Sequence, residues 1–255
     1  MVPVIQRVAC LVVLLCPAAC ELVGPHGVQP ADTAARAASM TPRLPLVAAA
    51  VASVSTERLV DDLTTLVGFG TRHTRSETES DTRGIGAARR WLQRRFEEIA
   101  DETGGRLLVH SERHVIPAGR RMPEDTELIN VVATIPGSDE QRVIVLSGHY
   151  DSRNGSDDDV SGDAPGANDD GTGTVAALEA ARCIALALGD RVPRATIRFA
   201  AVAGEEQGLY GSRAMAQADR AAERDVFAML TNDIVGGLGG GNGVANLGTL
   251  RLFSE

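Results

Sequence analysis

The sequence predicts an α/β protein with a largely parallel sheet that helices cover on both faces. Strand and helix patterns alternate over the second half of the chain, from about residue 142 to residue 235. The strand candidates there are continuous apolar runs, which is typical of strands buried on both faces. Hydrophobic residues make up 44% of the 255 residues, so the chain carries enough apolar surface for a sizeable core.

The first twenty residues have the layout of a secretory signal. A short head with Arg7 precedes an apolar stretch, Val8 to Leu15, which is too short to span a membrane. The segment "PAAC" resembles a lipoprotein cleavage site with Cys20 as the lipidated residue, although Pro17 stands where leucine is usual. We therefore expect export to the periplasm, the outside of the cell, or a lipid-anchored place in the cell envelope.

Composition narrows the classes of partner and compartment. All 25 basic residues are arginine, which together with the high alanine content is typical of a GC-rich bacterial genome. The net charge of −9 argues against a broad electrostatic grip on nucleic acid. Three of the four cysteines lie within or beside the signal, so no internal disulfide is expected, and Cys183 is interpreted as a small buried residue.

The elements follow one another along the chain after a linker predicted over residues 21–52, which are rich in Ala, Pro and Gly. A helix capped by Ser or Thr is predicted within 55–69, and a second one over 84–100 with one apolar face. That face carries Ile85, Trp91, Leu92, Phe96 and Ile99. The remaining elements are strands over 106–116, 127–135, 142–150, 195–203 and 226–235, and helices over about 171–188 and 211–223.

Acidic and imidazole side chains stand where the later strands end and in a Gly-rich turn before a helix. Because the carboxyl ends of parallel strands meet at one edge of a sheet, we expect these side chains to converge there. One imidazole with several carboxylates suits zinc or a similar divalent ion. The residues are His149, Asp151, Asp169, Asp170, Glu205, Glu206 and Asp233.

The adjacent pair Glu205–Glu206 can divide two tasks at such a centre. Metal-assisted hydrolysis needs a carboxylate that takes a proton and is not itself a ligand, so one glutamate can be the base and the other a ligand. His149 and Asp151 lie two residues apart, which lets Asp151 fix the tautomer of the imidazole. The simpler alternative is a helix-start pair of glutamates stabilised by the helix dipole.

Four segments resemble the motifs of one known family. "SGHYDS", "APGANDDGTGT", "AVAGEEQGLYGS" and "LTNDIVG" are similar, in this order and spacing, to those of the secreted di-zinc aminopeptidases. That family includes bacterial leucyl aminopeptidase and aminopeptidase Y and is related to glutamate carboxypeptidase. The resemblance covers about residues 55–255 and implies a three-layer helix–sheet–helix zinc exopeptidase domain with a mostly parallel mixed sheet, which we place over 53–255.

The resemblance implies a ligand set for two zinc ions. His149 and Asp233 hold one ion, Glu206 holds the other, and Asp169 bridges both. It also implies a cis peptide bond between Asp169 and Asp170. Asp170 is an alternative bridging ligand, although its place after "GAN" favours Asp169.

The resemblance also implies the reaction and the remaining roles. Glu205 is the general base that activates a water between the metals, and Asp151 orients His149. The substrates are peptides with a free N-terminus, and we expect a monomer that binds no nucleic acid. Two alternatives are a glutaminyl cyclase-like transferase with a single zinc ion and a peptidase-like binding domain without catalysis.

One departure from the family concerns a fifth ligand, a histidine after the fourth motif. No histidine follows His149 in this sequence, so the last zinc ligand is absent and we expect a C-terminally incomplete copy that is inactive as given. Among the other histidines, His73 is interpreted as structural, and His110 and His114 as exposed. The acidic run within residues 157–163 is interpreted as a solvated loop.

Overall fold

A five-stranded sheet in the order β1–β2–β4–β3–β5 organises the computed structural model, which describes residues 44–156, 158–237 and 253. β3 is parallel to both β4 and β5, whereas β2 is antiparallel to both β1 and β4, so β2 alone runs against the other strands. The strands are β1 (Leu108–Ile116), β2 (Thr126–Ile135), β3 (Asp139–His149), β4 (Ala195–Val202) and β5 (Asp225–Thr231).

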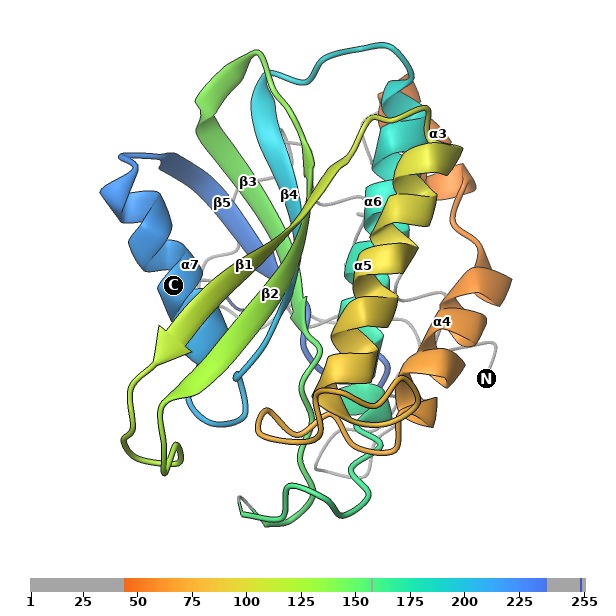
Figure 1. The fold of residues 1–255 in the computed structure, drawn as a ribbon. Coiled ribbons are helices and arrows are strands. Elements are labelled where there is room, and N and C mark those ends of the chain that lie inside the picture. The colour runs from red at the N-terminus through yellow and green to blue at the C-terminus, as the bar shows by residue number, and fades with distance from the viewer. Residues whose placement is uncertain (1–43, 157, 238–252, 254–255) are drawn as a thin grey trace, which may run out of the picture.

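Helices cover both faces of this sheet, as the sequence predicts (Figure 1). On one face lie α3 (Pro45–Ala52), α4 (Thr56–Gly68), α5 (Gly84–Glu102) and α6 (Thr172–Leu188). On the other face lies α7 (Tyr210–Ala221), which packs on β1 and β2. Each face has its own group of buried apolar side chains, the larger one under α4, α5 and α6 and the smaller one around Met215 of α7. The predicted three-layer helix–sheet–helix architecture with a mixed central sheet is therefore confirmed.

Helix α3 corrects the predicted linker. Residues 45–52 form a helix that begins with Pro45, whose fixed φ suits the first helical position, and continues through alanine-rich sequence. Ala50 is buried in the core, and Ser53 closes the helix by donating its hydroxyl to the carbonyl of Ala50 at 2.8 Å. The alanine-rich stretch shows no amphipathic period, so the sequence pattern did not reveal this helix. The predicted signal and residues 21–43 lie outside the described residues.

The two helices that precede the sheet form as predicted. In α4, Ser55 caps the N-terminus by accepting a hydrogen bond from the Arg58 amide at 3.3 Å, and Leu59 and Leu66 face the core. In α5, the predicted apolar face is buried except for Trp91, which is half-buried beside the Phe69 ring. These contacts hold the loop 69–83 between the two helices, and this loop supplies residues that lie around the candidate metal centre.

Helix α6 runs through the interior of the protein. The segment Ala167–Leu188 is the one described segment long and apolar enough to cross a membrane, yet 89% of that window is buried inside the protein. Its buried Glu179 is paired with Arg182, with Oε2 and Nε 2.9 Å apart, so the charge is not left without a partner. Cys183 is free and buried, as predicted.

The packing of β3 against α6 requires a glycine next to the site. A methyl group at Gly148 would lie 2.4 Å from the backbone carbon of Gly173 in α6. We expect Gly148→Ala to lower the free energy of unfolding by about 1–3 kcal/mol, because backbone atoms would have to move to make room. Urea denaturation followed by circular dichroism measures this change.

The matched control is Gly155→Ala, because nothing lies within 4 Å of a methyl group built at Gly155. This variant should stay within about 0.5 kcal/mol of the unmodified chain. Equal effects of the two substitutions would contradict the close approach of β3 and α6.

Candidate metal centre

The parallel strands bring the predicted groups to one edge of the sheet. His149 is the last residue of β3 and pairs with Val202, the last residue of β4, while Ser147 of β3 pairs with Thr231, the last residue of β5. The chain segments that leave the three strands therefore begin at nearly the same level. Glu205 and Glu206 follow β4, and Asp233 follows β5. Asp169 comes from the turn Ala167–Gly171 that leads into α6.

The imidazole of His149 lies at the centre of this group. Its Nε2 atom is 3.1 Å from Oδ1 of Asp169, 3.8 Å from Oε2 of Glu205 and 4.0 Å from Oδ1 of Asp233. Within the described part of the chain, His149, Asp169 and Asp233 form the group whose ligand atoms all lie within 4.8 Å of one another. His149 is buried and both aspartates are half exposed, so the group is open on one side.

The residues present fit a zinc ion. Nε2 of His149 is buried and makes no well-aligned hydrogen bond, whereas buried polar atoms normally have a partner. A cation held between this nitrogen and the two carboxylates would satisfy it. An imidazole with two carboxylates is a usual zinc donor set, and the open side leaves room for a further ligand or a substrate.

The charges around His149 explain its protonation. Burial lowers the pKa of His149, but the adjacent carboxylates of Asp151 and Asp169, with further negative charge nearby, outweigh burial and raise the pKa to about 12. Without a metal, the carboxylates therefore keep a proton on this imidazole. A metal ligand has to be a neutral imidazole, so a bound zinc ion takes the place of that proton.

Asp151 lies behind His149 and is fully buried. Nδ1 of His149 is 3.1 Å from the backbone oxygen of Asp151 and 3.5 Å from its Oδ1 atom, so both the backbone and the carboxylate of Asp151 lie against the ring. The carboxylate also accepts the backbone N–H groups of Glu205 and Glu206, both at 3.2 Å. Burial raises the pKa of Asp151, but His149 and these N–H groups hold it below its ordinary value, so the group stays charged.

The neighbouring aspartates at residues 169 and 170 have different tasks. The peptide bond between them is cis, as the family resemblance implies. Asp170 is fully buried and accepts the backbone N–H groups of His149 at 3.0 Å and Gly173 at 2.8 Å. Burial raises its pKa well above the ordinary value. The carboxylate of Asp170 thus ties β3 to α6, and the geometry favours Asp169 over Asp170 as a metal ligand.

The adjacent glutamates also differ. Burial raises the pKa of Glu205, whose carboxylate faces His149 without belonging to the group of three ligands. Glu206, the predicted ligand of a second zinc, instead accepts a hydrogen bond from Nε of Arg153 at 2.6 Å. Glu205 therefore lies beside His149, whereas the Glu206 carboxylate is paired with an arginine that the sequence did not indicate.

The sequence analysis also missed Arg72, whose side chain is fully buried beneath the site. Its guanidinium donates to the backbone oxygens of Tyr150 at 2.7 Å, Pro165 at 2.7 Å and Gly166 at 2.9 Å. Burial lowers its pKa to about 10, which still leaves it charged at neutral pH. Arg72 directly precedes His73 in the sequence, and only the histidine was interpreted there.

The remaining histidines and the acidic loop follow the predictions in most respects. His73 is buried and its Nδ1 atom accepts the Arg75 amide at 3.1 Å, as expected of a structural residue. His110 is exposed, as predicted. His114 is only partly exposed and lies 3.7 Å from Glu112, so the prediction that it is exposed was only partly correct. Asp158 and Asp163 are exposed, as a solvated loop requires.

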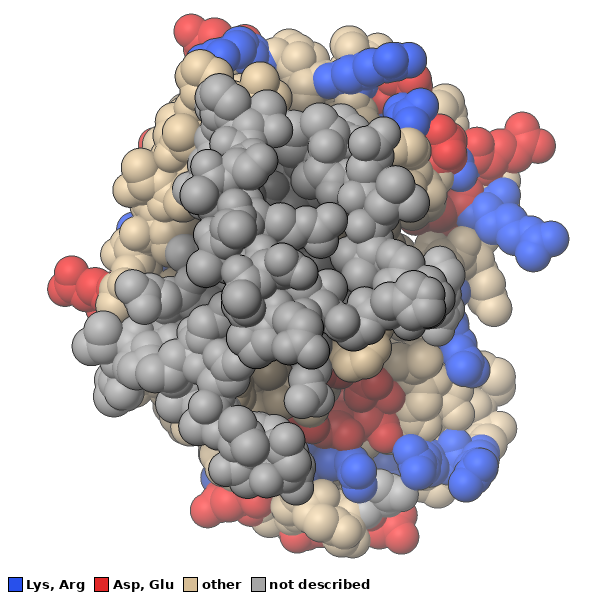
Figure 2. All heavy atoms as spheres, turned by 180° about the vertical axis from the view of Figure 1, so that it is seen from behind, with Lys and Arg blue, Asp and Glu red and all other residues tan. Residues whose placement is uncertain are grey.

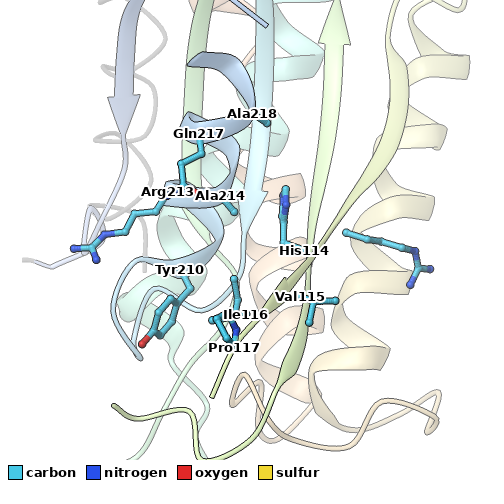
Figure 3. Close-up of a pocket in the computed structure, with 10 residues that line it drawn as sticks. His114, Val115, Ile116, Pro117, Tyr210, Arg213, Ala214, Gln217 and Ala218 are labelled. Atoms are coloured by element: carbon cyan, nitrogen blue, oxygen red, sulfur yellow. The ribbon is translucent and has the colours of Figure 1, made fainter. Parts of the chain in front are cut away.

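A separate cavity of about 800 Å³ lies between β1 and α7 (Figure 3). Its lining includes His114 and Ile116 from β1 and Tyr210, Arg213 and Gln217 from α7. It contains none of the residues of the candidate metal centre. We therefore assign the chemistry to the edge of the sheet at His149, where the titratable groups converge.

Comparisons with known proteins agree with this fold and site. Residues 130–249 match the sequence pattern of peptidase family M28. A probable zinc metalloprotease of Leptosphaeria maculans is 44% identical over 210 residues, which cover 82% of this chain and 48% of that protein. A probable leucine aminopeptidase of Trichophyton verrucosum is 35% identical over 201 residues, covering 77% of this chain and 49% of that protein. The chain spans about half the length of these relatives.

Solved structures share the fold. The LapA aminopeptidase of Legionella pneumophila has a TM-score of 0.57 at 23% identity, over 85% of this chain and 49% of that one. A glutaminyl cyclase of Porphyromonas gingivalis has a TM-score of 0.52 at 19% identity, over 71% of this chain and 59% of that one. The fold and site define a zinc exopeptidase-like domain. More narrowly, the chain belongs to peptidase family M28 over the matched residues, which confirms the resemblance seen in the sequence.

The protonation of His149 predicts how zinc binding depends on pH. Because its pKa of about 12 keeps it protonated at neutral pH, binding of zinc should release about one proton from this residue. The apparent affinity should then rise about tenfold for each unit of pH near neutrality.

Isothermal titration calorimetry in two buffers of different ionisation enthalpy measures the number of protons released. His149→Gln should abolish the effect together with tight binding. Identical binding enthalpies in the two buffers would contradict a protonated His149 in the metal-free protein.

Proposed function

We propose that the protein is a zinc-dependent exopeptidase that hydrolyses N-terminal residues from peptides. The observation that carries this proposal is the Glu205 carboxylate, which lies 3.8 Å from Nε2 of His149 but outside the group of three ligands. Family M28 and the printed names of the relatives, a probable zinc metalloprotease and a probable leucine aminopeptidase, support the same class of reaction.

The proposed site holds two zinc ions. His149 and Asp233 would hold one ion, Asp169 would bridge, and Glu206 would hold the second after release from Arg153. When bound, zinc supplies Lewis acidity toward the scissile carbonyl and toward the attacking water. The half-exposed carboxylates of Asp169 and Asp233 mark the side from which a substrate enters.

The side chain of Glu205 is suited to proton transfer. It is partly buried, and burial together with the neighbouring carboxylates raises its pKa, which brings a carboxylate closer to the range where it exchanges protons at neutral pH. In the proposed reaction Glu205 takes a proton from the attacking water and later gives it to the leaving amine. Asp151 keeps His149 in place and holds the backbone of Glu205 through its N–H group.

One observation favours a second candidate, a glutaminyl cyclase-like transferase with a single zinc ion. The pairing of Glu206 with Arg153 leaves, among the residues that the structure describes, one group of three ligands, which is enough for one ion. Turnover of leucyl peptide substrates without cyclisation of glutaminyl substrates supports the exopeptidase, and the reverse supports the transferase. A binding domain without catalysis would turn over neither substrate.

The proposal includes peptides with a free N-terminus as substrates, a monomeric state and export from the cell. The segment that ends at Cys20 supports export, and lipid labelling that Cys20→Ser abolishes would establish the anchor. In the described part of the face shown in Figure 2, acidic and basic side chains are interspersed rather than gathered into one broad basic surface. The net charge of −9 supports the proposal that nucleic acid is not among the partners.

The test of the assigned base is Glu205→Gln, made in a longer protein that also supplies the expected last histidine ligand. This variant should keep its zinc, because Glu205 is not among the ligands, while kcat on a leucyl peptide substrate falls by about 10²–10⁴-fold. Zinc content by mass spectrometry and steady-state kinetics measure the two effects. Turnover retained in Glu205→Gln would exclude the proposed base.

Two variants serve as comparisons. Glu140→Gln changes an exposed glutamate far from the site and should leave both quantities unchanged. Glu206→Gln should lower the zinc content from two ions to one. An unmodified protein that binds a single ion, and is unaffected by Glu206→Gln, would favour the single-zinc alternative.

A further inference from the structure

A buried polar network connects the loop after α4 to the site. We use this name for His73, Thr74, Gln207 and Asp151, which are each at most 4% exposed. The Thr74 hydroxyl is 3.0 Å from Oδ2 of Asp151 and also lies within hydrogen-bond distance of the Gln207 amide group. That amide group in turn lies 3.4 Å from Nε2 of His73. The network therefore runs from His73 to the carboxylate behind His149.

The Thr74 hydroxyl fixes the direction of the hydrogen bonds at one end. It carries a single proton, and both oxygens of the Asp151 carboxyl group already accept backbone N–H groups, so that proton points to Asp151. The oxygen of Thr74 is then an acceptor for its other neighbour. The structure places Oε1 of Gln207 toward Thr74, and the amide must therefore be turned over so that its NH₂ group faces Thr74 instead.

The His73 ring fixes the direction at the other end. Its Nδ1 atom accepts the Arg75 backbone N–H at 3.1 Å, so a neutral ring carries its proton on Nε2. Nε2 is then a donor, and the group of Gln207 that faces it must be the amide oxygen. Both ends thus require the same orientation of the Gln207 amide. In the opposite orientation, the amide oxygen and the Asp151 carboxylate would compete for the one proton of Thr74, and the amide NH₂ group would face the N–H of His73.

We infer that Thr74 and Gln207 are positioning residues, which hold the Asp151 carboxylate in the orientation that serves His149 and Glu205. Oδ2 of Asp151, which receives the Thr74 proton, also accepts the Glu206 amide, and Oδ1 accepts the Glu205 amide. Without the Thr74 hydroxyl, the carboxylate has one partner fewer and can rotate. The effect on catalysis rests on the proposed function, whereas the effect on metal binding does not.

The test compares Thr74→Val, which removes the hydroxyl at nearly constant shape, with Thr74→Ser, which keeps it. Zinc affinity is measured by competition with a chromophoric chelator, and kcat and KM are measured on a leucyl peptide. Thr74→Val should lower zinc affinity and kcat by about 10-fold with little change in KM, the low end of the range for direct partners of metal ligands, because Thr74 acts through Asp151. Thr74→Ser should remain within a few-fold of the unmodified chain.

A spectroscopic measurement on the unmodified chain covers the case in which Thr74→Val does not fold. Nitrogen-15 NMR of labelled histidine should show His73 neutral, with its proton on Nε2. A proton on Nδ1, or on both nitrogens, would overturn the inferred network. A folded Thr74→Val variant with unchanged zinc affinity would overturn the positioning role.

The outcomes separate this inference from the proposed function. If no variant hydrolyses peptides but Thr74→Val still weakens zinc binding while Thr74→Ser does not, the exopeptidase proposal fails and the positioning role stands. If the unmodified chain hydrolyses peptides and Thr74→Val matches Thr74→Ser in both measurements, the positioning role fails and the exopeptidase proposal stands.

Discussion

The burial of one charged carboxylate, Asp151, determines how the parts of the site meet. A buried carboxylate is costly unless hydrogen bonds and opposite charge surround it. Its partners come from three separate segments: the end of β3 with His149, the backbone after β4 with Glu205 and Glu206, and the loop after α4 with Thr74. The hydrogen bonds that the Asp151 carboxylate requires therefore hold the imidazole, the proposed base and the loop after α4 close to one another.

The same region carries more negative than positive charge, which favours binding of a cation. Carboxylates at residues 151, 169, 170, 205, 206 and 233 lie around a single imidazole, and the arginines nearby include Arg72, Arg121 and Arg153. The pKa values of Asp233 and Glu206 are raised by burial and by neighbouring carboxylates. A divalent ion between the half-exposed ligands would relieve this repulsion more effectively than the proton on His149 does.

The sequence predicted the strands and most helices because buried strands and amphipathic helices leave strong periodic signals. Helix α3 left no periodic signal in the sequence, because its alanine-rich residues are apolar on every side of the helix. The sequence also placed the acidic groups at one sheet edge and favoured Asp169 over Asp170 through the family resemblance, but it did not show what Asp170 binds or that Arg153 pairs with Glu206. Such distinctions depend on which backbone N–H or side chain lies opposite each carboxylate. Thr74 meets Gln207 across 133 residues of sequence, a contact that no local pattern encodes.

The Arg153–Glu206 pair gives the two proposed metal positions different requirements. The first position needs His149 to exchange its proton for a metal ion, whereas its carboxylates already face the imidazole. The second position needs Glu206 to leave a hydrogen-bonded arginine, whose side chain is 38% exposed. The Glu206 side chain is only 11% exposed, so the pair is screened less by water than a surface ion pair and its release costs more. Filling of the second position thus depends both on the ligands that zinc finds beside Glu206 and on the strength of the arginine contact.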